Sequence, residues 1–195
     1  MSYSHLHGAK IDVYDGAFHQ TMTGAFMDPN LPEGYAPFNI AAINGTLYVA
    51  YAQQSADKEE EEHGAGLGYV DAYSPTGEFQ RRIASANVLN APWGMALAPD
   101  DFGSFGGSLL VGNFGDGTIH AYDVDSGKLL GALKNDDGKA IVVDGLWALA
   151  FGNGAQAGET DELYVTAGPA DETHGLFGEI AAGEETDTTT VVPVH

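Results

Sequence analysis

The stretch TLYV at residues 46–49, followed by GYVDAY at 68–73 and TGEF at 76–79, decides the fold because the chain repeats it. The second copy has an apolar run, a glycine-led run and a turn: SLLV at 108–111, GTIHAY at 117–122 and SGKL at 126–129. The third copy has the two runs alone: ELYV at 162–165 and GLFGEI at 175–180. Phe38 and Trp93 are 55 residues apart, and Trp93 and Trp147 are 54 apart. A period of this length is typical of propeller blades.

Short runs rich in Val, Ile, Leu, Tyr and Phe alternate with Gly, Asp, Asn and Pro, which indicates strands joined by turns. No segment shows a helical period, and 27 glycines argue against long helices. We therefore predict an all-β chain. The expected strands of the two full copies are 39–42, 47–51, 69–73 and 79–83, then 94–98, 109–112, 119–123 and 129–133. The third copy supplies the three inner strands.

The repeat predicts a single propeller-type domain over residues 1–180, with about three four-stranded blades per chain. Its parts are a partial blade at 1–30 and blades at 31–86, 87–138 and 139–180; a flexible acidic, Thr-rich tail follows at 181–195. Alternatively, the valines near the end of that tail pair as an edge strand.

Residues 9–18 repeat only a third strand, its turn and the start of a fourth, so the leading blade lacks inner strands. Propellers close with about four to eight blades, and an open stack exposes apolar faces. We therefore expect a half-propeller that closes to six blades as a homodimer, because two-fold assembly is the commonest type. The alternative is a fragment of a longer protein.

The formal charge is −21, from 28 acidic residues against seven Lys and Arg. This balance excludes binding to nucleic acid or anionic membranes through a basic surface. It favours either solubility by self-repulsion or a cationic partner or metal ion. The chain has no cysteine, no apolar run long enough for membrane insertion, and no signal-peptide core in its first ten residues.

A propeller builds its ligand site around the mouth of the central channel, where the innermost strand begins and the next one ends. The pocket candidates at these positions are Phe38, Asn39, Gln53, Gln54, Trp93, Asn113, Asp116 and Trp147. Repeated aromatic residues at one blade position are commonly packing residues. The alternative is a stacking platform for a sugar or another flat ligand.

His5 and His7 are two apart, so on an extended strand both side chains share a face and can reach one ion. With Asp171 or His174 from a neighbouring or partner blade, they would form a three-ligand site of the kind that holds Zn²⁺. The alternative is two histidines in a loop near a chain terminus.

Four stretches carry a resemblance to a known family: GYAPFNI at 34–40, YAQQ at 51–54, LVGNFGDG at 110–117 and DGLWALAFGNG at 144–154. The chain resembles a family of bacterial conserved-hypothetical propeller proteins, many of them exported and some with a PEP-CTERM sorting tail. The resemblance implies a six-bladed fold related to NHL and gluconolactonase-type propellers, and a periplasmic or extracellular location. This chain matches only the C-terminal part and lacks the family's further N-terminal blades, and its last residues PVH are not a sorting signal.

The resemblance also implies a Ca²⁺ site on the channel axis, for which Asn39, Asn113 and Asp144 are the candidate ligands. The amide and carboxylate oxygens of these side chains suit a hard cation, which would polarise an ester carbonyl and activate water. The alternative is that these side chains only satisfy turn amides.

No nucleophile elbow, phosphate loop or dinucleotide fingerprint is present, which disfavours serine hydrolases, kinases and dehydrogenases. Two functions stay open. The first is a binding or scaffold propeller with a pocket at the channel mouth, whose partners are a second copy and a small molecule or sugar. The alternative is a hydrolase of lactones or esters that depends on a divalent metal, Ca²⁺ or Zn²⁺.

Overall fold

The computed structural model describes residues 2–182 and 189–193, with side chains from residue 6 to residue 182. Within these ranges every regular element is a β-strand except η1, a short 3₁₀ turn at Gly103–Phe105. The strands form four antiparallel sheets, which confirms the prediction of an all-β chain. The chain divides into two compact units, Met1–Pro92 (unit 1) and Trp93–His195 (unit 2).

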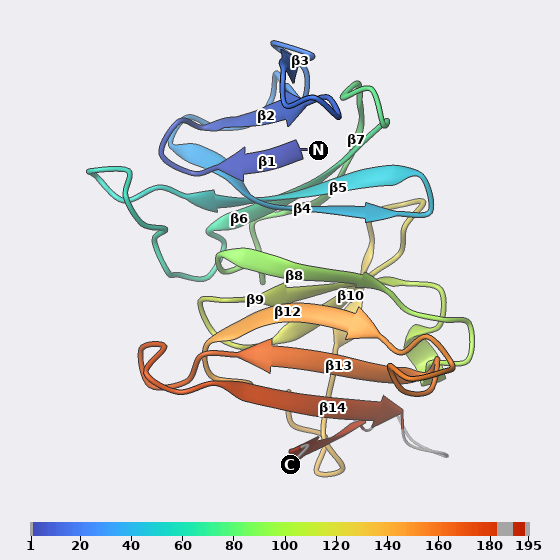
Figure 1. Ribbon diagram of the computed structural model, residues 1–195. Helices are drawn as coiled ribbons and strands as arrows, with labels where there is room; N and C mark the ends of the chain where they lie inside the picture. Colours follow the sequence, from blue (N-terminus) through green and yellow to red (C-terminus); the bar gives the residue numbers. More distant parts are fainter. Residues whose placement is uncertain (1, 183–188, 194–195) are drawn as a thin grey trace. The chain divides into compact units, whose positions relative to one another are not determined.

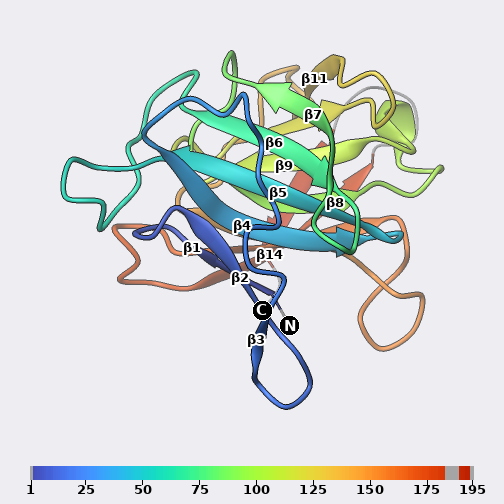
Figure 2. The same cartoon turned by 90° about the horizontal axis from the view of Figure 1, so that it is seen from above.

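Unit 1 contains two sheets. The smaller one comprises β1 (Ser2–His5), β2 (Lys10–Tyr14) and β3 (Gln20–Thr21), and the larger one comprises β4 (Tyr35–Ile43), β5 (Thr46–Gln53), β6 (Gly68–Tyr73) and β7 (Phe79–Ser85). Consecutive strands are neighbours, as Figure 2 shows for β4 to β7. β1 lies against β4, and the core between the sheets includes Ile11, Val49 and Tyr51.

Unit 2 contains two further sheets of four strands each. Their strands are β8 (Pro92–Leu97), β9 (Leu109–Asn113), β10 (Ile119–Tyr122) and β11 (Leu129–Ala132), then β12 (Leu146–Phe151), β13 (Glu162–Ala167), β14 (Leu176–Ala182) and β15 (Thr189–Pro193). β9 lies against β12 (Figure 1), over a core that includes Leu110, Leu146 and Leu163.

The two sheets of unit 2 approach each other closely at Gly94 of β8. A Cβ atom built there would lie 2.6 Å from the carbonyl oxygen of Trp147 and 2.8 Å from Cγ of Leu149. Both distances are shorter than van der Waals contact, so only glycine permits this spacing. The spacing places the start of β8 beside the start of β12.

The expected strands of all three copies are present, with ends that differ by a few residues. The sequence missed β1, which pairs with β2, because its four residues are too few to show an alternation. Part of the tail, Thr189–Pro193, pairs with β14 as an outer strand, while 183–188 and 194–195 lie outside the described residues. In the part of the chain that the structure describes, no helix is long and apolar enough to cross a membrane.

A buried ionic network fixes the segment before β4 onto the outer strands of unit 1. Arg82 of β7 donates from Nη2 to Asp28 and from Nε to Asp71 of β6. The side chains of Asp28 and Asp71 are only 1% and 0% exposed, whereas that of Arg82 is 23% exposed. Phe26 packs on Tyr73 nearby, with 5.5 Å between ring centroids. The ionic and the aromatic contact both hold the segment that links β3 to β4, together with a hydrogen bond of 2.8 Å from the Phe26 amide to the Gly77 carbonyl.

Burial makes the carboxyl group of Asp71 titrate near neutrality. Its pKa is raised to about 7 by burial, against the lowering effect of the Arg82 hydrogen bond and charge. Because the folded pKa exceeds the unfolded value near 3.8, the folded state binds this proton more tightly. The corresponding stability is present below the unfolded pKa and is lost as the pH rises through about 7.

Candidate ligand-binding site

Three aromatic rings meet in unit 2 and form what we call the aromatic cluster: Trp93, Phe114 and Trp147. The ring centroids of Trp93 and Trp147 are 5.1 Å apart at an angle of 86°, and those of Phe114 and Trp147 are 4.4 Å apart at 37°. Trp93 and Trp147 are each the second residue of their strand, β8 and β12. All three side chains are half-buried. The structure thus brings two predicted pocket residues into contact and adds Phe114.

The turn between β9 and β10 carries Phe114. It is closed by the Gly117 amide, which donates to the Asn113 carbonyl over 2.9 Å. Asp116 Oδ1 accepts from the Thr118 amide at 3.0 Å and from the Thr118 hydroxyl at 2.6 Å. Gly117 has φ +71°, a left-handed conformation that favours glycine. These bonds hold the turn in the shape that presents Phe114 to Trp147.

Asn113 and Asp116, both predicted for the pocket, are engaged within this turn. Asn113 is buried, and its Nδ2 donates to the Thr118 hydroxyl over 3.2 Å. The same hydroxyl lies 3.0 Å from His120 Nε2. Burial lowers the pKa of His120, against the opposing effect of Asp116, and so favours the neutral imidazole. These side chains therefore orient the turn.

Glu172, in the connection between β13 and β14, reaches the aromatic cluster. The indole Nε1 of Trp147 donates to Glu172 Oε1 over 2.9 Å, which sets the orientation of that ring. Asp144, just before β12, accepts from the Ala170 amide over 3.1 Å and so fastens the same connection. Asp144 thus bonds a backbone amide 26 residues further along the chain. Glu172 was not predicted, because no repeat marks its position.

The other four pocket candidates belong to unit 1: Phe38, Asn39, Gln53 and Gln54. Phe38 lies where the pairing of β4 with β5 shifts register. Asn39 accepts from the Ile40 amide over 2.8 Å, and Gln54 Nε2 donates to the Leu6 carbonyl over 2.7 Å. Asn39 thus bonds the amide of the next residue, whereas Gln54 links the end of β5 to the turn after β1.

The predicted metal ligands are divided between the two units of the chain. The side chain of His5 lies outside the described residues, and His7 Nδ1 is 3.2 Å from the Lys58 carbonyl in unit 1. Asp171 and His174 are exposed in unit 2. Among the side chains that are described, no group of three or more His, Asp and Glu is placed to hold a metal ion.

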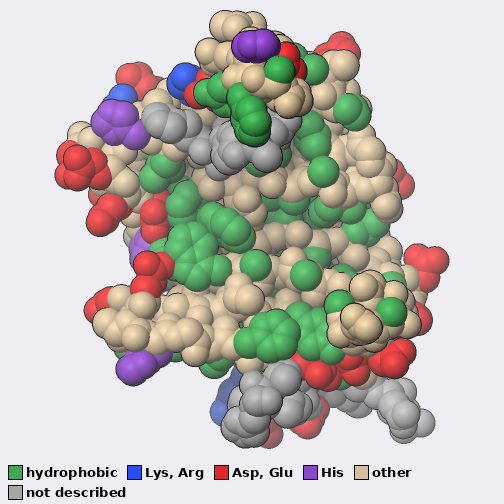
Figure 3. Space-filling model, in the orientation of Figure 1, with side chains coloured by type: hydrophobic (Ala, Val, Ile, Leu, Met, Phe, Trp, Pro, Cys, Tyr) green, Lys and Arg blue, Asp and Glu red, His purple; other side chains and the backbone are tan. Residues whose placement is uncertain are grey.

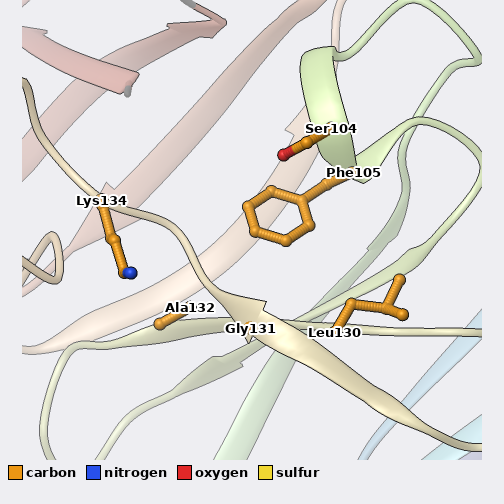
Figure 4. Close-up of a pocket in the computed structure, with 6 residues that line it drawn as sticks. All are labelled: Ser104, Phe105, Leu130, Gly131, Ala132 and Lys134. Carbon is orange, nitrogen blue, oxygen red and sulfur yellow. The ribbon is translucent and has the colours of Figure 1, made fainter. Parts of the chain in front are cut away.

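A pocket that the sequence did not reveal lies beside β11 in unit 2 (Figure 4). It has a volume of about 320 Å³ and is lined by Ser104, Phe105, Leu130, Gly131, Ala132 and Lys134. Ser104 and Phe105 belong to η1, the next three residues belong to β11, and Lys134 lies two residues after the end of β11. No motif marks these residues, because the pocket forms only where the connection between β8 and β9, which contains η1, packs beside the outer strand β11.

Comparison with known proteins finds relatives in a virus, and no protein-family model matches the chain. Three uncharacterized proteins of Acanthamoeba polyphaga mimivirus are 36%, 40% and 35% identical to it, over 177, 147 and 177 residues. These matches cover 88%, 72% and 87% of this chain but only 43%, 27% and 46% of the relatives. The chain therefore spans less than half the length of the curated relatives it matches.

The resemblance to a bacterial propeller family is wrong, so it no longer supports a periplasmic or extracellular location. The four stretches that carried it contain strand ends and turns, such as the turn at Gly117 with φ +71°. Gly, Asn and Asp are favoured in tight turns of many unrelated folds, so such stretches do not by themselves identify a family. By sequence, this all-β chain is related to uncharacterized mimivirus proteins.

Proposed function

We propose that this chain is a binding module whose ligand occupies the aromatic cluster of unit 2. The supporting observation is the mutual contact of Trp93, Phe114 and Trp147, three half-buried rings at one place. Aromatic side chains offer a large, rigid surface at low entropic cost, and Glu172 already orients the Trp147 indole. The ligand class is a sugar or another flat molecule that stacks on the rings while Glu172 accepts from its hydroxyl groups.

Both tryptophans of the chain lie in this cluster, so tryptophan fluorescence reports on the proposed site alone. We expect a saturable change when the protein is titrated with a panel of neutral sugars and planar heterocycles. Phe114→Ala keeps both tryptophans and is expected to weaken binding roughly tenfold, since an aromatic contact contributes about 1.4 kcal/mol. Isothermal titration calorimetry gives the affinities.

Phe177→Ala is the matched control, because Phe177 is exposed on β14 and stacks on Tyr164 away from the cluster. It should leave the affinity unchanged. A panel without any saturable binder would contradict the proposal. Turnover of a lactone or aryl ester that a chelator abolishes would instead support the metal-dependent hydrolase.

We also propose that the sheets are propeller blades and that a second copy of the chain completes the ring. The repeat of the sheets and the packing of β9 on β12 support this arrangement. The viral relatives extend well beyond the matched segment, which leaves room for further blades in their own chains.

Light scattering coupled to size-exclusion chromatography tests this assembly. We expect a mass twice that of the 20.4 kDa chain at micromolar concentration, because uncovered blade faces would expose apolar surface. A monomer of that mass with the circular dichroism of a folded β-protein would refute the second-copy proposal. It would leave the binding site in unit 2 to be judged by its own titration.

A further inference from the structure

A short connection, which we call the strap, covers one side of the core of unit 1. It comprises residues 22–33 between β3 and β4, and in Figure 2 this blue segment runs across the sheet of β4 to β7. Among the described residues, the only hydrogen bond between its backbone and the backbone of the rest of unit 1 runs from the Phe26 amide to the Gly77 carbonyl. Phe26 has φ +61°, a strained left-handed conformation for a residue other than glycine. A segment with so few backbone bonds opens more easily than the sheet on which it packs.

The second anchor of the strap is ionic. Asp28 and Asp71 share the guanidinium group of Arg82, and both carboxyl groups are buried. Cations are scarce in this chain, which has seven Lys and Arg for 28 acidic residues, and basic side chains are few on the face drawn in Figure 3. When both carboxyl groups are ionised, the site therefore holds one more buried negative charge than Arg82 balances.

Tyrosine and apolar side chains complete the surroundings of this site. The hydroxyl groups of Tyr51 and Tyr73 are 2.7 Å apart, and burial raises the pKa of both, so neither ionises near neutral pH. Tyr69 contributes its ring, which lies 4.5 Å from Cζ of the arginine, and β2 contributes the apolar side chains of Ile11 and Val13. The charge balance near neutral pH therefore depends on the carboxyl groups themselves.

The proton on Asp71 is coupled to the position of the strap. Burial raises the pKa of Asp71 to about 7; Arg82 lowers it, and the charge of Asp28 raises it. Opening the strap removes Asp28 and leaves Arg82 to Asp71 alone, which lowers that pKa. Because the docked pKa is the higher one, the stability of docking is fully present below the undocked pKa and is lost as the pH rises through about 7.

We propose that the strap is a pH-sensitive lid, which stays docked in mildly acidic solution and opens towards neutral pH, when Asp71 ionises beside Asp28. With Asp71 protonated, one buried carboxylate faces one guanidinium group and the docked site is balanced. Opening carries Asp28 into water and bares the rings of Phe26 and Tyr73, so this apolar surface becomes accessible only as the proton leaves. The lid belongs to unit 1 and does not depend on the function proposed for the aromatic cluster.

The protection factor of the Phe26 amide against hydrogen exchange, followed by NMR, measures opening of the strap. We expect it to fall at least about tenfold between pH 5 and pH 7.5 and then to level off, since one unit of pKa difference between the docked and open states corresponds to a factor of ten. The amides of β5 should stay better protected than that of Phe26, because the opening is local. Asp71→Asn imitates the protonated carboxyl group and should abolish the fall.

Glu33→Gln is the matched control, because it removes an exposed acidic group from the strap itself. It should show the same fall as the unmodified protein. Asp28→Asn gives a second reading should Asp71→Asn fail to fold, since it leaves Arg82 with one carboxylate and should reduce the fall. A protection factor that does not change with pH, or an undiminished fall in the Asp28 and Asp71 variants, would overturn the proposal. Equal protection of Phe26 and the β5 amides at every pH would also overturn it, because opening would then be global unfolding.

Discussion

Replacing Arg82 with methionine is expected to lower the free energy of unfolding by about 3 kcal/mol at pH 8, the range for removing one partner of a buried ion pair. The substitution leaves the carboxylates of Asp28 and Asp71 buried at 1% and 0% exposure without their cation. Methionine preserves most of the side-chain volume, so the loss reports on charge more than on packing. Urea unfolding measures it.

Tyrosine signals report mainly on unit 1 in this experiment, because seven of the nine tyrosines lie there while both tryptophans lie in unit 2. Without Arg82, the folded pKa of Asp71 rises further above its already raised value near 7. At pH 5 the Asp71 carboxyl group of the folded variant is therefore protonated, and burying it without Arg82 leaves no uncompensated charge on Asp71. At pH 8 the same group must either ionise while buried or hold its proton against the solvent. The deficit should therefore be smaller at pH 5 than at pH 8.

Two comparisons decide whether the buried charges cause the effect. Adding Asp28→Asn and Asp71→Asn to the Arg82→Met variant should recover much of the stability, because no buried charge remains. Lys10→Met breaks the Lys10–Asp12 pair, whose lysine is 54% exposed, and should cost less than about 1 kcal/mol. Equal losses for Lys10→Met and Arg82→Met would show that burial of the network is unimportant.

Replacing Gly117 with alanine is expected to cost about 3 kcal/mol of unfolding free energy, from left-handed backbone strain and overpacking together. Gly117 has φ +71°, and a Cβ atom there would lie 2.2 Å from the Val143 carbonyl oxygen. The clash falls on backbone, which cannot move aside as a side chain can. Tryptophan fluorescence during urea unfolding follows unit 2 directly.

Gly138→Ala is the matched control for this variant. Gly138 has φ +73°, but a Cβ atom there meets no atom within 4 Å. It should therefore cost only the backbone strain, about 1 kcal/mol. The turn that contains Gly117 also carries Phe114, so Gly117→Ala should reduce ligand binding at the aromatic cluster while Gly138→Ala should not. Equal losses from the two substitutions would contradict the close contact with Val143.

The strands of this protein could be predicted because their signals are local. The TLYV and GYVDAY runs mark β5 and β6 through alternating residues bounded by turn residues, and their copies mark the sheets of unit 2. The same repeat placed Trp93 and Trp147 at equivalent positions. A four-residue strand such as β1 carries too short a pattern to be recognised.

The composition of the candidate site could not be predicted, because it depends on which separate segments pack together. Glu172 becomes the partner of the Trp147 indole only when the connection after β13 folds back over β12. Asn113, expected at a pocket, turns its amide to Thr118 inside its own turn. Sequence position shows that a residue is near a strand end but not which neighbour its side chain meets.

By itself, then, the sequence determined an all-β chain, the positions of most strands and the equivalent positions of two tryptophans in the repeat. The tertiary structure decided that Asp28 meets Arg82 across 54 residues, that Phe114 joins the tryptophans, and that η1 and β11 enclose a pocket. Strand formation follows from alternation and turn residues within a few positions of each other. Side-chain contacts follow from close packing between sheets, where the partners are distant in sequence and no periodic pattern records them.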